Sequence, residues 1–565
     1  MKLQYDDSEI DAFVWKFISA SNSSEDFRLY LKQFAAPAHK DEATLKIKAL
    51  TDDASGGQLF FAEAIRELEK LAQSGNVQAQ FHLAKAYSIG SGIEKDTDQT
   101  LRWYQLAALQ GDIRSKHNLA MMYLYGDGAA KDLPKARGLL ESTAGMGSPE
   151  SKCYFGMMNV RGDGGEKNVM YGMEMLANAY EDGVAEAAYF LGRILLDGYD
   201  VMANNDEGMN WLRRAATMGD LDAQLELGKR LRAGRGCTLN PHQAVEWFLE
   251  AAEQGSAEAQ SYLGVMYLEA EGVPKDGAES VRWLKCASEK GDPIAQYNLG
   301  LVFVRGKEAP KNFAEAVKWF RRAAEGGFAV AQHRMAEISH FGWYDVPKDM
   351  DAALAWYNKA ARQGEPEAQL GLGIYLSGCE APADREAAFK WIRLSSIQGN
   401  PRATAILGDF YRRGLTAQPD NKKAMELYKK SAMAGCSLGQ AYLGQAYLFG
   451  EIIEPDYSEA AHWISMAAEQ GEARSAYLIG IMFLRGYGVE RDAKAAMEWF
   501  KTAADRGEVI AKHHIGLLYY AGDGIDRNID EAEKWINEAA DEGCGEAREW
   551  LSKHTAKSTQ ESECA

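Results

Sequence analysis

A glycine that recurs about every thirty-six residues constrains the fold of this chain more than any other feature. It occurs fourteen times, at Gly75, Gly111, Gly147, Gly183, Gly219, Gly255, Gly291, Gly327, Gly364, Gly399, Gly435, Gly471, Gly507 and Gly543. Only the blocks that begin at Gly327 and Gly364 depart from this spacing, by one residue each. Such a period is typical of a solenoid, in which each short unit is stable only when it stacks on its neighbours.

Two further positions, counted from this glycine as position 0, predict the ends of helices. Position +15 is glycine in twelve of the thirteen blocks, if a one-residue slip at Gly378 is allowed, and Ala270 is the exception. Glycine suits the left-handed residue that follows a helix. With the same slip, position +21 is Asp or Asn in every block, and these are preferred N-cap residues. The pattern therefore predicts a helix A over about +3 to +14 and a helix B over about +22 to +34.

Small and aromatic residues at fixed positions indicate how the two helices pack. Position +9 is always Gly or Ala, which allows close approach of a second helix, and position +28 is Trp in ten blocks. A small residue follows four positions after +28, so the Trp and this small residue share one helical face. We interpret the tryptophans as core residues that fill the seam between neighbouring helix pairs.

The repeat resembles a known family. The resemblance rests on the run Ala259, Gln260, Leu263, Gly264, Tyr267, Gly272, Val273, Lys275, Asp276, Trp283 and Ala287. These residues are similar to the Sel-1-like repeat family, a relative of the tetratricopeptide repeat. The resemblance implies an all-α fold, a right-handed α/α superhelical solenoid of about thirteen helix-pair repeats. Family members are generally adaptors that hold proteins together. The cysteine-rich branch of the family has paired cysteines within each repeat, and this sequence departs from it.

The segments outside the regular repeats are assigned from their helical patterns. Residues 75–543 form the thirteen repeats, and residues 58–74 resemble the second helix of a degenerate repeat that precedes them. Residues 1–57 are predicted to be a helical N-terminal cap or a partner-specific segment, because a solenoid needs a modified end. A C-terminal capping helix is expected over 544–553 and a disordered tail over 554–565.

Charge and cysteine usage exclude several classes of partner and location. The formal net charge is −19, which argues against nucleic acid as a partner, since phosphate neutralisation needs clustered Lys and Arg. The first thirty residues lack a signal peptide pattern, and no run of apolar residues is long enough to cross a membrane. Seven cysteines lie at scattered phases of the repeat, so we expect a reducing compartment, the cytoplasm.

No motif in the sequence indicates catalysis, and we predict that the protein is not an enzyme and has no cofactor or metal. The Gly-Asp-Gly triplets, such as Gly126–Gly128, fall where helix A ends, so they are interpreted as helix terminators and not as phosphate loops. Ser-x-x-Lys, His-Glu-x-x-His and Cys-x-x-Cys do not occur. His333 and His340 are seven residues apart, and His513 shares the phase of His333. Solvated or partner-facing imidazoles explain them better than a metal site does.

The variable face of helix A is the predicted binding surface. If +4, +8 and +12 are buried, then +3, +6, +10 and +13 point away from the core, with +7 and +14 at the margin. We expect this face to line the concave surface of the solenoid. Its candidate partner-binding residues are Arg161, Tyr189, Arg193, Arg232, Tyr297, Arg305, His333, Tyr477 and Arg485. Aromatic and arginine side chains are typical hot-spot residues. The alternative is that they only pair with acids of the next helix A.

These observations predict a non-enzymatic scaffold or adaptor that binds a protein or peptide partner on its concave helix A surface. Two alternatives are a chaperone-like binder and an immunity protein that neutralises one secreted or toxic protein. A hydrolase is a further, weaker alternative, because no nucleophile and base occur at motif spacing. The sequence leaves open whether the protein is a monomer or a homodimer.

Overall fold

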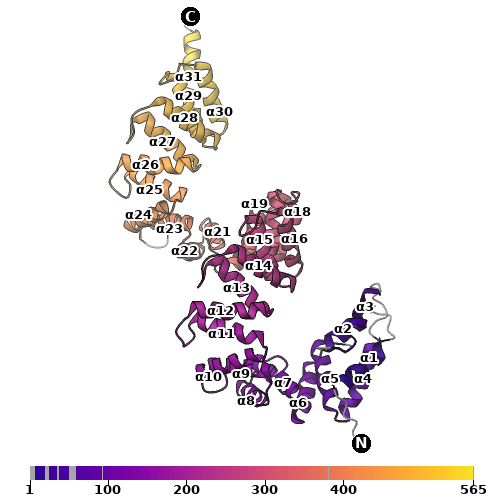
Figure 1. The fold of residues 1–565 in the computed structure, drawn as a ribbon. Coiled ribbons are helices and arrows are strands. Elements are labelled where there is room, and N and C mark those ends of the chain that lie inside the picture. Colours follow the sequence, from indigo (N-terminus) through magenta and orange to yellow (C-terminus); the bar gives the residue numbers. More distant parts are fainter. Residues whose placement is uncertain are drawn as a thin grey trace. The chain divides into compact units, whose positions relative to one another are not determined.

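The structure is a computed structural model that describes residues 7–19, 24–34, 37–49, 59–91, 93–379, 381–415 and 418–563 (Figure 1). Every regular element in these ranges is a helix. The chain divides into two units, Met1–Cys286 and Ala287–Ala565, which are called the N-terminal and C-terminal units below. The predicted all-α repeat fold is confirmed, because helix pairs follow one another through both units.

Four helices precede the first regular repeat: α1 (Asp7–Ile18), α2 (Ser24–Gln33), α3 (Lys40–Ala49) and α4 (Leu59–Gln73). The A helices of the repeats are α5 (Val77–Ile89), α7 (Ile113–Tyr125), α9 (Pro149–Arg161), α11 (Ala185–Asp197), α13 (Leu221–Ala233), α15 (Ala257–Glu269), α17 (Pro293–Arg305), α19 (Ala329–Phe341), α21 (Pro366–Ser377), α23 (Pro401–Arg413), α25 (Ser437–Phe449), α27 (Ala473–Arg485) and α29 (Val509–Ala521). The B helices are α6 (Thr97–Leu109), α8 (Leu133–Gly145), α10 (Val169–Glu181), α12 (Asn205–Thr217), α14 (Pro241–Glu253), α16 (Gly277–Glu289), α18 (Phe313–Glu325), α20 (Met350–Arg362), α22 (Pro382–Ile397), α24 (Asn421–Met433), α26 (Tyr457–Glu469), α28 (Ala493–Asp505) and α30 (Ile529–Asp541). A 3₁₀ turn η1 (Trp343–Asp345) follows α19, and α31 (Gly545–Glu563) is the last helix described.

The helix ends are set by the residues that the repeat predicts. The side chains of Asp96, Asp132 and Asn168 each accept a hydrogen bond from a backbone N–H in the first turn of the following helix. Gly126 and Gly162 end their A helices in the left-handed conformation, with φ of 79° and 77°. These local signals therefore mark the starts of most B helices and the ends of most A helices.

One block departs from this scheme. In the block from Gly364, the acid at the predicted N-cap phase is Asp384, but it lies within the first turn of α22. That helix begins at Pro382, whose fixed φ suits a first helical position. Gly378, predicted to be left-handed, has φ −82°. The one-residue difference in the length of this block is therefore taken up by the loop between α21 and α22. At the C-terminus, α31 continues past residue 553 into the segment predicted to be a disordered tail.

The core of each repeat is built on the residue that follows position +28. These residues are all buried: Tyr104, Leu140, Leu176, Leu212, Phe248, Leu284, Phe320, Tyr357, Ile392, Tyr428, Ile464, Phe500 and Ile536. They lie against the small residue at +9. A Cβ added at Gly480 would come within 2.7 Å of the Phe500 ring, and one at Gly300 within 2.6 Å of the Phe320 ring. The glycine at +9 therefore makes room for this side chain of helix B.

The tryptophans at +28 lie at the edge of the core. Trp103, Trp283 and Trp319 are buried, but the other seven are only partly buried. Several carry a cation over the ring, such as Arg282 over Trp283 at 4.2 Å and Lys359 over Trp356 at 4.4 Å. Even so, the indoles pack on neighbouring repeats, as Trp211 does on Tyr180 of the preceding B helix at 5.2 Å. The tryptophans therefore contribute to the seam between helix pairs, as interpreted, and share it with the more deeply buried residue that follows each of them.

A pair of glutamines links successive repeats, which the sequence analysis did not predict. Gln80 donates from Nε2 to the carbonyl of Ala72, near the end of the preceding helix, and Gln224 does the same to Ala216. The Oε1 atom of Gln80 then accepts from Gln110, which directly precedes the repeat glycine Gly111. The carbonyls of Ala72 and Ala216 also accept from the backbone N–H of Gly75 and Gly219, so each glutamine adds a second donor at a helix end.

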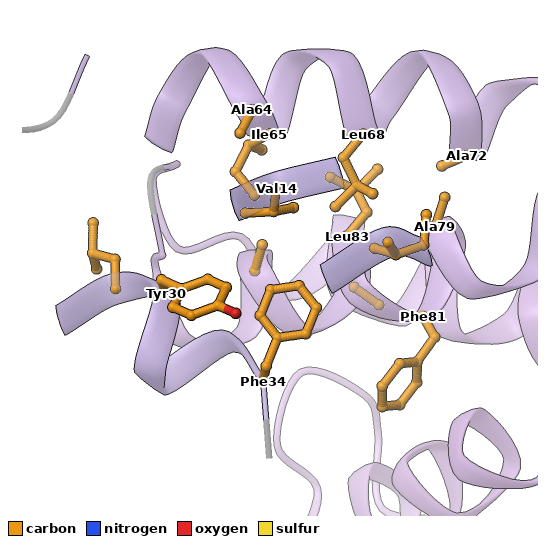
Figure 2. Packing of buried hydrophobic residues seen from close by; sticks show 14 of the residues in the cluster. Val14, Tyr30, Phe34, Ala64, Ile65, Leu68, Ala72, Ala79, Phe81 and Leu83 are labelled. Carbon is orange, nitrogen blue, oxygen red and sulfur yellow. The ribbon is translucent and has the colours of Figure 1, made fainter. Parts of the chain in front are cut away.

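The N-terminal segment shares its core with the first repeat. Figure 2 shows Val14 of α1 and Phe34, which directly follows α2, lying close to Leu68 of α4 and Leu83 of α5. All of these side chains are buried. Helix α4 occupies the place of the predicted degenerate repeat helix at 58–74 and packs directly on α5. The end of the array is thus covered by helices without the repeat signature.

Candidate functional site

The arginines at position +14 project from the ends of the A helices. Arg161, Arg305 and Arg485 are exposed, and none of them forms an ion pair with a residue that the structure describes. An unpaired guanidinium is notable in a chain whose formal net charge is −19. It can bind a carboxylate with two parallel hydrogen bonds.

The tyrosines at position +6 are packing residues. Tyr477 is 7% exposed and belongs to the core of the C-terminal unit, where its ring lies 5.9 Å from Phe500 and 5.3 Å from His514. Tyr297 is partly buried, 5.4 Å from Phe320 and 5.7 Å from Phe328. The prediction that these two tyrosines are free to grip a partner is therefore corrected.

The physical reason is that helix A has neighbours on three sides. It packs on its own helix B and also on helices of the adjacent repeats, as α9 does on α8, α10 and α11. The sequence analysis assumed that helix A has one buried face, and position +6 lies outside that face. In the structure the next repeat covers a second face of helix A, and position +6 lies on it. On this second face, Arg474 lies over the Tyr477 ring at 4.9 Å.

Two predicted arginines are held by acids of their own unit. Arg193 forms a hydrogen bond to the Tyr189 hydroxyl at 3.5 Å and an ion pair with Asp197 at 3.2 Å. Arg232 pairs with Glu271 at 2.7 Å. Tyr189 is partly buried and Arg193 is exposed. Arg232 thus follows the alternative in which the cation pairs with an acid of the next repeat, whereas Arg193 keeps an exposed guanidinium.

The histidines of this face are more buried than predicted. His513 is 6% exposed and His333 is partly buried, so the expectation that they are solvated is corrected. Burial lowers the pKa of His333 to about 4, and the nearby Arg334 acts in the same direction. His333 is therefore neutral at pH 7 and packs beside the Tyr357 ring, 6.0 Å away.

Acidification is expected to destabilise the repeats around His333. Between pH 6.5 and pH 4 the unfolded chain binds a proton at this imidazole and the folded chain does not, so folded-state stability is lost as the pH falls. From pH 7 to pH 5 the loss should be about 1–2 kcal/mol. Unfolding of wild type and His333→Gln at both pH values measures it as the difference between the two proteins. The same substitution at His242, whose side chain is 79% exposed, is the control for the loss of an imidazole at the surface.

A cavity brings two of the predicted residues together. Arg161 at the end of α9 and Arg193 of α11 line a hollow of about 130 Å³ between these helices. Its apolar walls come from Met157, Phe190 and Ile194. A guanidinium beside an apolar hollow can bind a side chain that carries both a carboxylate and methylene groups. Arg305 and Arg485 lie in the other unit and are not part of this cavity.

A second hollow lies two repeats earlier, at the equivalent positions. It has a volume of about 430 Å³ and is lined by α5, α6 and α7. In this second hollow, position +10 of α5 is Lys85 and position +10 of α7 is Met121. In the cavity between α9 and α11, the same positions are Met157 and Arg193. Position +14 of the earlier helix is Ile89 in the second hollow and Arg161 in the cavity between α9 and α11. Lys85, Ile89 and Phe190 were not among the predicted site residues. An exposed apolar residue at +14, such as Ile89, was the signal in the sequence that could have indicated them.

No group of three or more His, Cys, Asp or Glu residues in the described part of the chain is arranged to hold a metal ion. Among the described helices, none has the length and apolar character needed to cross a membrane.

Comparison with known proteins shows which repeat this is. The family model described as the Sel1 repeat matches twelve segments, at 77–112, at 113–148 and in ten consecutive segments over 185–544. The matches leave out residues 149–184, which still form the helix pair α9 and α10. No curated protein matches the chain by sequence.

The solved structures that are similar to this chain include two that are described as Sel1 repeat or SLR proteins. A protective antigen of uropathogenic Escherichia coli strains, which displays an SLR fold, is 27% identical, with a TM-score of 0.55 over 86% of this chain and 97% of that one. A Sel1 repeat protein from Oxalobacter formigenes is 29% identical, with a TM-score of 0.33 over 66% of this chain and 94% of that one.

Proposed function

Because this chain belongs to the Sel1 repeat family, we propose that it is a non-enzymatic scaffold that binds a protein or peptide partner on the exposed surface of its A helices. Repeat solenoids of this family are generally protein-interaction scaffolds. The surface in question joins the ends of consecutive A helices, and in the N-terminal unit it includes the cavity between α9 and α11.

The observation that carries the proposal is the arginine pair at this cavity. Arg161 is exposed, has no ion-pair partner in the described residues and stands beside an apolar hollow that Arg193 also lines. Arginine next to apolar surface is typical of protein-binding hot spots. The block that carries Arg161 is also the one that the family model does not match, so this site departs from the common repeat pattern.

Reversal of both charges is expected to remove the partner. The double variant Arg161→Glu/Arg193→Glu should recover its partner at least about tenfold less than wild type in quantitative affinity purification from native cells, since each hot-spot arginine contributes about 1–4 kcal/mol. The fold should be retained, because both side chains are exposed.

The matched control reverses two exposed arginines on B helices of the same unit, Arg102→Glu/Arg213→Glu. It makes the same change in net charge and should keep the partner. Equal recovery of every partner by both double variants would show that binding does not use the α9–α11 surface. The melting temperature of each variant shows whether a loss reflects binding or folding.

We also propose that the protein works in the cytoplasm. The six cysteines in the described residues are free thiols, and Cys153 and Cys544 are buried in separate parts of the core. A reducing compartment keeps such thiols unpaired.

A further inference from the structure

The cavity between α9 and α11 and the equivalent one beside α5 and α7 are repeats of one subsite. Each lies between the A helices of successive repeats, with position +10 of both helices and position +14 of the first at its rim. The same positions between α7 and α9 are Met121, Met157 and Tyr125. Three consecutive subsites therefore follow one another from α5 to α11. The first lies between α5 and α7, the middle one between α7 and α9, and the third between α9 and α11.

The first subsite combines a cation with apolar walls. Lys85 lines it beside Ile89 and Met121, and the structure shows no ion pair between Lys85 and any described residue. Burial lowers the pKa of the Lys85 ammonium and the nearby Arg114 acts in the same direction, whereas the Asp7 carboxylate, which lines a neighbouring cavity with Lys85, raises it. A partly desolvated ammonium of this kind gains most from an added carboxylate.

The middle subsite is apolar and exposed. Tyr125 is 65% exposed, and Met121 and Met157 are partly buried on either side of it along the array. Methionine adapts its shape to varied apolar side chains, and an exposed tyrosine offers a large rigid contact surface. The hydroxyl of Tyr154 is already bound by Glu186, at 2.9 Å, so the polar groups next to this subsite are satisfied within the protein.

The third subsite is the arginine cavity between α9 and α11. Arg161 supplies an unpaired guanidinium there, and Arg193 a second one that Asp197 only partly neutralises. The first and third subsites are therefore cationic, and the middle subsite between them is apolar.

Ion pairs within the chain close both ends of this series. Before the first subsite, Asp7 of α1 binds Arg114 and lies 2.7 Å from the buried His82. These hydrogen bonds from His82 and Arg114 hold the pKa of Asp7 well below its usual range. After the third subsite, Arg230 binds both Asp197, at 3.3 Å, and Glu226, at 2.6 Å. Other cations of this stretch, such as Lys116 of α7 and Arg102 of α6, also form no ion pair with a described residue, but they lie outside the +10 and +14 positions that line the cavities.

The geometry points to a linear ligand, and we propose that α5, α7, α9 and α11 bind an extended peptide segment with an acidic residue at each end and an apolar residue midway between them. This inference rests on the proposed function and specifies the partner of that surface. Packed helices lie about 8–10 Å apart, and an extended chain advances about 3.3 Å per residue. Neighbouring subsites are therefore spaced by about three peptide residues, which gives the pattern acid, two residues, apolar, two residues, acid.

Peptide display tests the pattern. A library of random twelve-residue peptides is selected on the full-length protein, and enriched sequences are remade with blocked C-termini so that only side-chain carboxylates can act. We expect the selected peptides to share two acids about six residues apart with an apolar residue between them. Lys85→Glu and Arg161→Glu/Arg193→Glu should each weaken binding at least tenfold, while Arg102→Glu/Arg213→Glu should not.

Charge exchange makes the test specific for each subsite. A peptide whose acid at one end is replaced by lysine should bind Lys85→Glu or the Arg161→Glu/Arg193→Glu variant better than it binds wild type. Selection of no peptides, or of peptides that bind all variants equally, would overturn the inference. If the arginine variant loses its cellular partner and yet no linear pattern is selected, the partner binds as a folded surface, so the scaffold function stands and the peptide proposal fails.

Discussion

Replacement of Phe500 by alanine is expected to destabilise its repeat by about 3–5 kcal/mol, since large-to-small changes of a buried aromatic residue leave a cavity. Phe500 is 0% exposed and lies against Gly480, which has no side chain that could move into the space. Its ring also lies within 6 Å of Tyr477 and His514, so the cavity reaches the next repeat.

The preceding residue provides the matched control. Trp499 is only partly buried. Trp499→Ala should therefore lower the free energy of unfolding by less than Phe500→Ala does, although tryptophan is the larger of the two side chains. Hydrogen exchange of α27, α28 and α29 measures both effects locally, which is needed because repeat arrays unfold in parts. A greater loss of protection in Trp499→Ala would show that the tryptophan, and not the residue after it, holds the repeats together.

Gly488→Ala is expected to lower the free energy of unfolding by roughly 3–5 kcal/mol. Both the left-handed backbone, which disfavours a Cβ, and overpacking contribute to this loss. Gly488 has φ +68°, and an added Cβ would overlap the backbone of Tyr457 and Ser458 at the start of α26. Because backbone atoms in a helix cannot move aside alone, the substitution should separate the loop from the preceding helix pair.

Gly507→Ala separates these two contributions. Gly507 also has a positive φ, +90°, but a Cβ there would meet nothing within 4 Å. Gly507→Ala should therefore lower the free energy of unfolding only by the backbone strain of an alanine with positive φ, about 1–2 kcal/mol. Thermal or chemical unfolding of both variants gives the comparison, and equal costs would mean that the contact between the loop and α26 contributes little to stacking.

The sequence by itself determined the local structure of this protein. Asp96 caps α6 and Gly126 ends α7 through bonds to atoms a few residues away, so a single sequence is enough to predict them. The family and the number of repeats follow from the same short-range pattern, and Arg161 was predicted as a surface residue because position +14 lies at the margin of the face that points away from the core.

Only the tertiary structure decided what each helix face contacts. Trp499 and Phe500 are both large and aromatic, and the sequence does not tell which of them meets Gly480. Tyr477 was predicted to be free because the face covered by the next repeat cannot be derived from one helix. The cavity that unites Arg161 with Arg193 arises in the same way, since it forms between helices that are a full repeat apart in the sequence and meet only when the repeats stack.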